Sequence, residues 1–365
     1  MKAAVLNDGE TALRIEDVQV DAVGPHEILV KTAAAGLCHS DLYHLDGVFD
    51  IPRPTVIGHE SAGVVVEVGS RVDDFAPGDH VITCLATFCG RCERCLGGRS
   101  HLCESGRSVR AAGEGSRLRR GGPTGAGEEV HQFLNVSSFA EYLLVHESAA
   151  VSIDKRMPLD LAALIGCGVT TGLGAVFNKA RVRAGDTVAV LGCGGIGLSA
   201  IQGARIAGAS RILAVDLNAD KLEVARRLGA TEALVPGEGD LAEQIMRLLG
   251  GGADHCIEAV GSAVTATAAL ECLAVGGTAT IVGLMPAGRT FPVQGRLLLD
   301  DRKLQGAYMG AENFRLAMPK YVAMYLDGRL LLEEMVSSRI AIEGVNEAFD
   351  SMRRAEALRD LIIFD

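Results

Sequence analysis

The chain has 365 residues, of which 48% are hydrophobic and 22% are charged, a balance typical of a folded protein of more than one domain. It carries 46 acidic against 35 basic residues, a formal net charge of -11, so nucleic acid and anionic membrane surfaces would repel it. We therefore expect neither nucleic acid nor membrane as a partner.

The amino-terminal segment favours a cytoplasmic protein. Residues 1–8 reach an acidic side chain before any apolar stretch that is long enough for a signal peptide. Two charge-free runs, 161–178 and 187–204, reach the length of about 18 residues that a membrane span needs, but glycines and polar residues interrupt both. Both runs therefore favour buried core. In a reducing compartment, the ten cysteines indicate metal binding or catalysis in place of disulfides.

The first elements along the chain are β-type. Between residues 29 and 81, short runs such as 61–68 alternate with glycine and proline turns and predict a strongly twisted antiparallel β domain. Residues 104–127 are rich in Gly, Ser and Arg and predict a long surface loop. This loop is either a solvated excursion or a rim that attracts anionic substrates through its arginines, which are Arg107, Arg110, Arg117, Arg119 and Arg120.

After Ala184 the pattern changes to a regular alternation of strands and helices. Amphipathic segments at 219–228 and 263–273 separate β-type runs at 187–191, 211–216, 232–235, 254–259 and 278–283. This order predicts a doubly wound parallel sheet with helices on both faces, an α/β fold. The tail from about residue 309 is more helical and ends in a strand-like segment at 361–364.

A glycine-rich motif follows the first of these strands and opens a predicted helix at 196–207. The motif consists of Gly192, Cys193, Gly194, Gly195, Ile196 and Gly197. Its glycines allow a tight turn and a close backbone approach, and the helix N-terminus offers N–H groups to a pyrophosphate. The alternative is a tight turn without a cofactor, which the strand and helix on either side disfavour. The context therefore predicts a dinucleotide site.

The residues beyond the motif indicate which dinucleotide it is. Asp216 ends the next predicted strand, where a carboxylate accepts hydrogen bonds from both ribose hydroxyls and repels a 2′-phosphate. We therefore expect NAD in preference to NADP. Lys221 either contacts a ribose oxygen or lies on a solvated helix face. Val260 and Val282 are further candidate cofactor positions.

Four cysteines form a compact C-x2-C-x2-C-x7-C lobe: Cys89, Cys92, Cys95 and Cys103. Four thiolates close a tetrahedral shell and leave no open position, which predicts a structural zinc. The alternative of four free cysteines is disfavoured, because exposed thiols so close together oxidise or bind metal. We expect the cysteines outside the metal-ligand patterns to be small buried hydrophobic residues, namely Cys84, Cys193, Cys256 and Cys272.

A second set of metal-ligand residues is dispersed, and spacing alone does not connect its members. Cys38 lies in Gly36-Leu-Cys-His-Ser-Asp41, His59 in Gly58-His-Glu60, and Cys167 in Gly166-Cys-Gly-Val-Thr-Thr-Gly172. These signatures, with the cysteine lobe and the dinucleotide motif in this order, resemble the zinc-dependent medium-chain alcohol dehydrogenases over almost the whole chain. The resemblance implies that Cys38, His59 and Cys167 bind a catalytic zinc whose fourth position is open to substrate.

The resemblance also implies a domain organisation. A GroES-like β-rich catalytic domain is expected at 1–168 and 310–365, and a Rossmann NAD-binding domain at 169–309. Two zinc ions and one NAD are expected per subunit. The long segment between Cys103 and Phe139 resembles the longer-loop members, which are commonly homodimers, although a tetramer is possible.

Further roles follow from the resemblance position by position. Asp41 matches the carboxylate that orients the zinc-bound histidine, and Glu60 matches the acidic residue beside the metal. Ser40 matches the hydroxyl that takes the alcohol proton. His39 and Arg359 match basic groups that bind the pyrophosphate.

The chain departs from the family at the end of the proton relay. Many members have a histidine five residues after the first zinc cysteine, where this chain has Tyr43, followed by His44. Tyr43 resembles the glutathione-dependent formaldehyde dehydrogenase branch, whereas a shift by one residue would let His44 serve. His44 alone is otherwise a surface or packing histidine.

The expected reaction is the NAD-linked oxidation of primary alcohols to aldehydes, and its reverse. The positions that align with the family's pocket walls are apolar and suit medium-chain, terpenoid or aromatic substrates; they are Phe49, Leu85, Phe133, Leu134 and Leu284. One alternative is the oxidation of a thiol–formaldehyde adduct, which Tyr43 and Arg107 favour and Phe49 disfavours. The alternative of another class is a dinucleotide-binding protein without catalysis, which the complete set of zinc ligands disfavours.

Overall fold

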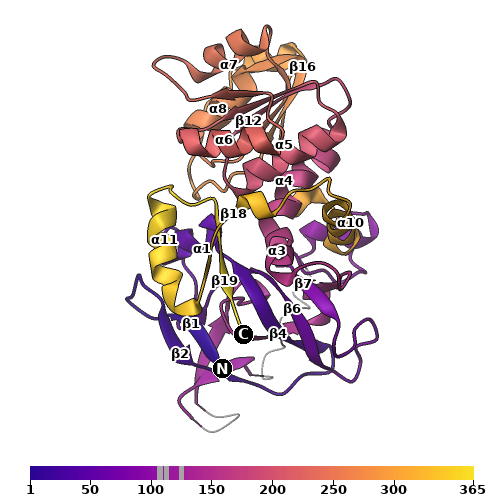
Figure 1. Ribbon diagram of the computed structural model, residues 1–365, viewed down its shortest axis with the longest axis vertical. Coiled ribbons are helices and arrows are strands. Elements are labelled where there is room, and N and C mark those ends of the chain that lie inside the picture. Colours follow the sequence, from indigo (N-terminus) through magenta and orange to yellow (C-terminus); the bar gives the residue numbers. More distant parts are fainter. Residues whose placement is uncertain (105–109, 111–114, 123–126) are drawn as a thin grey trace. The chain divides into compact units, whose positions relative to one another are not determined.

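The computed structural model describes residues 1–104, 110, 115–122 and 127–365, so Arg107 lies outside the described residues. The chain divides into two compact units (Figure 1). The β-rich unit comprises Met1–Cys167, Asn313–Gly328 and Val336–Asp365. The parallel-sheet unit comprises Gly168–Glu312 and Arg329–Met335.

The β-rich unit contains two sheets. The first has the order β2-β1-β5-β9-β8-β3, with strands at Arg14–Asp17, Lys2–Leu6, Thr55–Val56, Glu128–Gln132, Leu118–Arg120 and Gln19–Val20. The second has the order β11-β7-β6-β4-β19-β18, and β10 also pairs with β4; these strands are Ala150–Ser152, His80–Thr83, Glu60–Val68, Glu27–Gly36, Arg359–Ile363, Val336–Ile340 and Tyr142–His146. Most pairs are antiparallel, as the alternating pattern predicts.

Short helices complete this unit. The α-helices are α1 (His39–Leu45), α2 (Glu93–Leu96), α3 (Leu159–Leu164), α10 (Phe314–Leu326) and α11 (Val345–Arg353). Single turns of 3-10 helix lie at Ser100–Leu102, Phe133–Asn135, Glu147–Ala149 and Ile342–Gly344. One apolar core joins α1 and α11 to the sheets through buried side chains that include Leu42, Phe139, Phe349 and Ile362. This core holds α1 in place, and α1 begins at Cys38.

The parallel-sheet unit contains one sheet whose strands all run in the same direction. Its order is β14-β13-β12-β15-β16-β17, with strands at Glu232–Leu234, Arg211–Val215, Thr187–Leu191, Ala253–Glu258, Leu273–Ile281 and Lys303–Gly306. The order reverses between β12 and β15, the neighbours of the glycine-rich motif. In sheets of this kind, ligands bind at the carboxyl ends of the strands where the order reverses.

Helices cover both faces of this sheet (Figure 1). The helices are α4 (Thr170–Gly174), α5 (Gly195–Ala207), α6 (Ala219–Leu228), α7 (Leu241–Leu249), α8 (Ala263–Glu271) and α9 (Gly295–Leu299), with helical turns at Ile165–Val169, Ala175–Ala180, Met309–Ala311 and Glu333–Met335. Ala189 and Leu191 of β12 pack against α7 and α8, while the intervening Val188 and Val190 are equally buried. Burial of successive residues is expected when both faces are covered.

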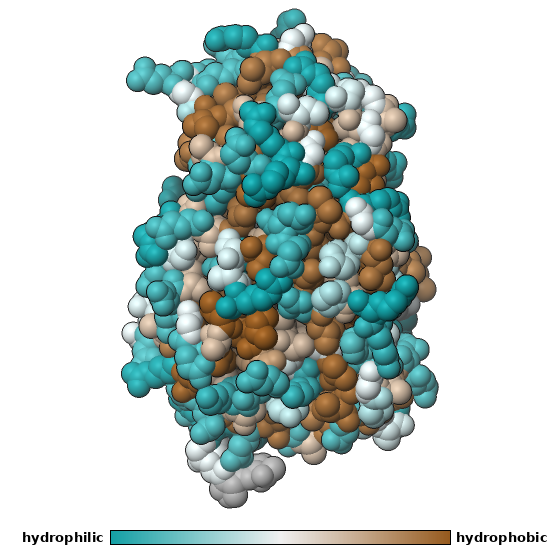
Figure 2. Space-filling model, in the orientation of Figure 1, coloured by the Kyte–Doolittle hydropathy of each residue, from teal (hydrophilic) through white to brown (hydrophobic). Residues whose placement is uncertain are grey.

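One described stretch, Leu159–Ala180, is long and apolar enough to cross a membrane. It contains the whole charge-free run 161–178 that was predicted above as buried core, and 89% of its most apolar window is buried. Helices in protein cores pass the same length and composition test. On the face drawn in Figure 2, hydrophilic residues are interspersed with hydrophobic ones, as on most water-exposed protein surfaces.

Part of the predicted arginine-rich loop has regular structure, which corrects that prediction. Leu118–Arg120 forms β8, and Leu118 is 2% exposed. Arg117 is also buried, and its Nε lies 2.6 Å from the buried Glu27 carboxylate. Arg110 bonds the same carboxylate at 2.7 Å. The sequence could not indicate this, because Glu27 lies 90 residues before Arg117.

The other described arginines of this segment are paired as well. Arg119 contacts Glu129 at 3.3 Å, and Arg120 contacts Glu16 at 2.7 Å and Glu128 at 2.9 Å. The four described arginines of the segment are thus held by acids of their own unit. Within the part of the chain that the structure describes, they do not form the unpaired basic rim that was one reading of the sequence.

Candidate functional site

The three dispersed metal-ligand residues come together in the β-rich unit. Ligand atoms of Cys38, His59, Glu60 and Cys167 all lie within 4.8 Å of one another, and all four residues are buried. Cys38 is the N-cap of α1, His59 immediately precedes β6, which begins at Glu60, and Cys167 lies in the helical turn after α3. Three segments far apart in the sequence therefore supply one cluster.

Asp41 connects two members of the cluster. One of its carboxylate oxygens accepts the backbone N–H of Cys38 at 3.0 Å, and the other lies 2.8 Å from His59 Nδ1. Asp41 is fully buried. In the neutral imidazole, which is the form that binds a metal, the Nδ1–H of His59 donates to the carboxylate and the lone pair is on Nε2. This is the arrangement in which a carboxylate orients a metal-binding imidazole.

The cluster passes a direct test for a metal. His59 Nε2 is buried and has no hydrogen-bond partner among the described residues. A buried acceptor without a partner is costly, and a cation removes that cost. Two thiols and one imidazole are the donors of catalytic zinc sites that keep an open position. The residues therefore fit a zinc ion.

Two glycines make the cluster possible. A Cβ on Gly36 would lie 2.8 Å from Glu60 Oε2 and 3.0 Å from Arg359 Nη2, so glycine leaves room for these two side chains. Gly58 has a φ of +89°, and a Cβ there would lie 2.5 Å from the Phe139 ring and from Ser138 Oγ. A larger residue at Gly36 would displace Glu60 or Arg359, and one at Gly58 would displace Phe139 or Ser138.

Arg359 lies within the cluster. Its guanidinium is buried and forms an ion pair with Glu60 Oε2, while Glu60 Oε1 is buried without a partner among the described residues. Register explains the contact, because Glu60 and Leu361 both pair with Gly36 on β4. The predicted contact of Arg359 with a pyrophosphate stays a prediction.

The cluster shifts the acidity of its members. The hydrogen bond with Cys167, with the charges of His59 and Arg359, holds the pKa of Cys38 well below its usual range. Burial lowers the pKa of His59, but the charges of Asp41 and Cys38 raise it overall. Burial raises the pKa of Glu60 to about 8, although Arg359 opposes the shift. A thiolate at Cys38 is the form that binds a metal.

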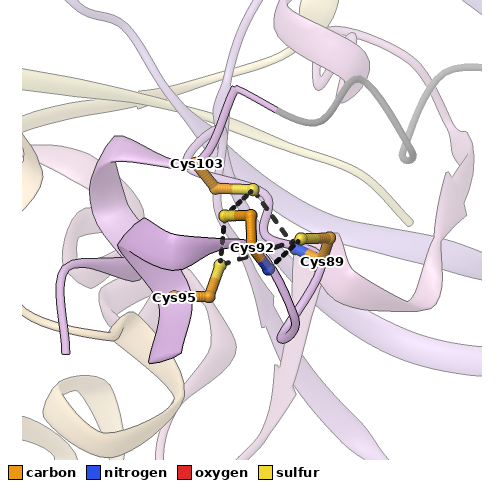
Figure 3. Close-up of side chains that lie close together, drawn as sticks. All are labelled: Cys89, Cys92, Cys95 and Cys103. Atoms are coloured by element: carbon orange, nitrogen blue, oxygen red, sulfur yellow. Dashed lines mark hydrogen bonds between the residues drawn. The ribbon is translucent and has the colours of Figure 1, made fainter. Parts of the chain in front are cut away.

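The four-cysteine lobe forms a second cluster (Figure 3). The sulfur of Cys92 lies 3.4 Å from that of Cys95 and 3.8 Å from that of Cys103, and the sulfurs of Cys89 and Cys95 are 3.9 Å apart. Four sulfurs at about 2.3 Å from a zinc ion would lie about 3.8 Å apart. The backbone N–H groups of Cys92 and Cys89 donate to the sulfurs of Cys89 and Cys103. The lobe fits a structural zinc.

Aromatic side chains surround α1 and His59. The Phe133 ring packs edge-on against the His59 and His44 rings, with distances between ring centroids of 5.9 Å and 4.7 Å. His44 Nδ1 lies 3.0 Å from the Phe49 carbonyl oxygen, and Phe49 contacts Tyr43. His44, Phe133 and Leu134 also line a cavity of about 460 Å³.

The other predicted site residues of this unit differ in exposure. His39 is exposed and Ser40 half-buried on the first turn of α1; Leu85 is half-buried beyond β7. Leu134 is 38% exposed with a φ of +50°. The remaining cysteines are fully buried, as expected, at Cys84, Cys193, Cys256 and Cys272.

The glycine-rich motif has the geometry that close ligand approach requires. Gly192 has a φ of +93°. A Cβ on Gly197 would lie 1.7 Å from the Gly192 carbonyl oxygen, so only glycine allows α5 to approach β12 this closely. A Cβ on Gly194 would meet nothing within 4 Å. Gly195 and Ile196 follow on the first turn of α5, half-buried. The space above Gly194 fits a pyrophosphate at a helix N-terminus.

Asp216 connects this loop to β13. Its carboxylate accepts the backbone N–H of Cys193 at 2.7 Å and that of Asn218 at 2.9 Å. Lys221 on α6 is 9% exposed, so the alternative prediction, that it lies on a solvated helix face, is wrong. Of the other predicted positions in this unit, Val282 is half-buried, Val260 is 46% exposed and Leu284 is 44% exposed.

Two residues of this region escaped the sequence analysis. Leu217 follows Asp216 and is 82% exposed, an apolar side chain beside the predicted ribose site. Glu258 ends β15 and is fully buried. An acidic residue at the end of an apolar strand is a signal that could have identified Glu258, because a buried carboxylate needs a specific partner.

Two family models match the chain. An alcohol dehydrogenase GroES-like domain matches residues 24–155, and a zinc-binding dehydrogenase domain matches residues 195–323. The chain belongs to the zinc-dependent medium-chain alcohol dehydrogenase family. The predictions of the family and of the fold class, a GroES-like domain with a Rossmann domain, are thereby confirmed.

Individual relatives cover the whole chain. An S-(hydroxymethyl)glutathione dehydrogenase of Saccharomyces cerevisiae is 37% identical and is covered over 96% of its length. The crystal structure of an alcohol dehydrogenase zinc-binding domain protein from Burkholderia ambifaria is 34% identical, with a TM-score of 0.93 and 98% of that chain covered. That of benzyl alcohol dehydrogenase from Acinetobacter calcoaceticus is 29% identical, with a TM-score of 0.92 and 99% covered. The protein is therefore an oxidoreductase of this zinc-binding family.

Proposed function

We propose that this protein is a zinc-dependent, NAD-linked alcohol dehydrogenase that interconverts primary alcohols and aldehydes. The observation that carries the proposal is His59 Nε2, a buried atom that has no partner among the described residues and lies within 4.8 Å of two buried thiols. A site with three protein ligands leaves a position for a substrate oxygen. The open space above Gly194 in the glycine-rich motif supports binding of a dinucleotide as the redox partner of the alcohol.

Each side chain of the cluster has a defined task in this proposal. Cys38, His59 and Cys167 hold the zinc ion, which when bound supplies Lewis-acid chemistry to the substrate oxygen. Asp41 keeps the His59 ring in the orientation and tautomer that present Nε2. Ser40 Oγ takes the proton of the alcohol. Glu60 and Arg359 balance charge behind the cluster.

The parallel-sheet unit would hold the dinucleotide. The nicotinamide ring of a bound dinucleotide would supply the hydride acceptor. The N-terminal turn of α5 would bind the pyrophosphate, and the Asp216 carboxylate would accept hydrogen bonds from the ribose hydroxyls. The other proposed cofactor positions of this unit are Lys221, Val260 and Val282. Asp216 disfavours NADP because its carboxylate would meet the 2′-phosphate.

Apolar side chains favour medium-chain, terpenoid or aromatic alcohols. Phe133 and Phe49 pack around His59 and His44, and Leu85 and Leu134 are the other proposed pocket walls of this unit. The role of Leu284 stays a prediction. The relative named a benzyl alcohol dehydrogenase supports an aromatic substrate. We further propose a cytoplasmic homodimer with domain bounds at 1–168 with 310–365, and 169–309.

A second candidate is oxidation of an S-hydroxymethyl thiol adduct. It is favoured by Tyr43 and by the relative named S-(hydroxymethyl)glutathione dehydrogenase. Such an adduct with glutathione carries carboxylates, which unpaired arginines would recognise. Arg110 does not offer this, because its N–H groups already donate to Glu27, Asp21 and the Ala22 carbonyl oxygen.

One set of assays tests both candidates. Turnover would be followed by NADH absorbance with octanol, with benzyl alcohol, and with formaldehyde plus glutathione. Higher kcat/KM on the alcohols supports the proposal, and higher kcat/KM on the adduct supports the second candidate. Zinc analysis accompanies the assays. Dinucleotide binding without turnover on any substrate would indicate a protein that binds the cofactor without catalysis.

A further inference from the structure

Glu258 holds the turn that carries Val260. The side chain is 0% exposed. Its Oε1 accepts the backbone N–H groups of Val260 and Gly261 at 3.0 and 2.8 Å. Thr265 Oγ1 donates to the same oxygen at 2.7 Å. Since a buried carboxylate is costly unless donors surround it, these three bonds make its burial tolerable.

The direction of the hydroxyl bonds is fixed by chemistry. An ionised carboxylate only accepts, so the single proton of Thr265 Oγ1 points to Glu258. Ser262 Oγ lies 2.7 Å from Thr265 Oγ1 and must then donate to it. Ser262 Oγ in turn accepts the backbone N–H of Thr265, which caps α8. The carboxylate therefore orders both the turn and the start of the next helix.

The backbone of Glu258 orders a second turn. Its carbonyl oxygen accepts the N–H groups of Val282 and Gly283 at 2.8 and 3.0 Å. On its other side, the N–H of Ala259 donates to the Leu191 carbonyl oxygen at the end of β12. Glu258 and Ala259 together thus connect the ends of three neighbouring strands at the edge where the glycine-rich motif begins.

The turn has little freedom to shift. A Cβ on Gly192 would lie 2.7 Å from Val260 Cγ2, and a Cβ on Gly283 would lie 2.1 Å from the Gly261 nitrogen. Val260 is therefore packed directly beside the glycine-rich motif. Glu258 Oε2 has no partner among the described residues, so the side-chain hydrogen bonds of Glu258 are all made through Oε1, to this turn and the start of α8.

We infer that Glu258 is a positioning residue for the dinucleotide. It sets the Val260 turn and the Val282 turn against Gly192 without itself forming the binding surface. This inference rests on the proposed function, because the dinucleotide is the ligand that these turns would contact. Loss of the carboxylate frees the turn, and ordering it again on binding costs affinity.

The test compares four proteins: wild type, Glu258→Ala, Glu258→Asp and Thr231→Ala. Thr231 Oγ1 also accepts a backbone N–H, that of Ile212 at 2.9 Å, near the amino-terminal edge of the same sheet. It therefore controls for a general loss of stability in this unit. NADH affinity is measured by nicotinamide fluorescence, which no tryptophan disturbs because the chain has none. Melting temperature, zinc content and KM values complete the measurement.

We expect Glu258→Ala to bind NADH about tenfold more weakly than wild type, while Thr231→Ala stays within about twofold. The KM for the dinucleotide rises, whereas the KM for the alcohol at saturating dinucleotide does not. Equal affinities of Glu258→Ala and wild type, or equal losses in both alanine variants, overturn the inference. If Glu258→Ala does not fold, Glu258→Asp decides, since its shorter side chain withdraws the acceptor; unchanged affinity there also overturns it. A wild-type protein that binds no dinucleotide refutes the proposed function and the inference together.

Discussion

The buried carboxylate of Glu27 offers the sharpest test of the energetics of the β-rich unit. It accepts hydrogen bonds from Arg117 Nε at 2.6 Å, from Arg110 Nη2 at 2.7 Å and from the backbone N–H of Gly24 at 2.8 Å. Glu27→Gln keeps the shape of the side chain and removes its charge. Both guanidinium groups then lose their common partner inside the unit, which is the costly way to break a buried ion pair.

The magnitude follows from the acidity of Glu27. Burial would raise its pKa, but the hydrogen bonds and charges of Arg110 and Arg117 lower it from 4.5 to about 2. One pKa unit corresponds to about 1.4 kcal/mol, so ionisation of Glu27 stabilises the fold by about 3 kcal/mol at neutral pH. Because the pKa is lowered on folding, this contribution is complete above pH 4.5 and is lost as the pH falls toward 2.

Urea unfolding followed by circular dichroism measures the effect in wild type and in Glu27→Gln. Asp154→Asn is the matched control: Asp154 also has a pKa lowered to about 2, through hydrogen bonds from Arg156, but this ion pair is solvent-exposed. We expect the control to unfold at the wild-type urea concentration, because exposed pairs are screened by water. The reasoning is refuted if Glu27→Gln unfolds like wild type at pH 7, or if the difference stays constant from pH 5 to pH 3.

Three further predictions concern the metals and the cofactor. Cys38→Ala should lower the zinc content from two ions to one and abolish turnover with an unchanged circular dichroism spectrum; full activity would contradict the role of Cys38. Cys103→Ser should also remove one zinc and should lower the melting temperature, because the lobe loses its closed shell; an unchanged melting temperature and zinc content would contradict a structural site. We expect wild type to prefer NAD over NADP by about a hundredfold in kcat/KM, and Asp216→Gly to reduce this preference. Equal use of NADP by wild type would show that Asp216 does not bind the ribose.

The sequence predicted the features that depend on local pattern. The alternation after Ala184 and the glycine-rich motif both act within about 30 residues, so the parallel sheet and its loop could be recognised directly. The cysteine lobe is likewise local, since Cys89 and Cys103 lie 14 residues apart. The cluster of Cys38, His59 and Cys167 needed the family resemblance, because no spacing rule connects residues so far apart.

Local sequence patterns could not predict the buried ion pairs. Glu27 meets Arg117 across 90 residues, and Glu60 meets Arg359 across 299. The second pair arises from strand register, because the strands of Glu60 and Arg359 both pair with β4, and register is set by packing of the whole sheet. The first pair joins β4 to the residue before β8, which belongs to the other sheet. A single sequence shows only that a charged residue stands in a segment. It does not show that the residue points inward toward a partner, which is why the arginine-rich segment resembled a solvated loop.

The pairing of these arginines bears on the substrate. Arg110 and Arg117 line the same cavity as His44 and Phe133, and an unpaired guanidinium there would select an anionic substrate. Both are instead bonded to Glu27, and Arg110 also to Asp21, so the charges of these two arginines are balanced by acids of the same unit. A balanced wall gives no net attraction to a carboxylate and no penalty to a neutral ligand. The two described arginines of this cavity wall therefore offer no unpaired positive charge to an adduct that carries carboxylates.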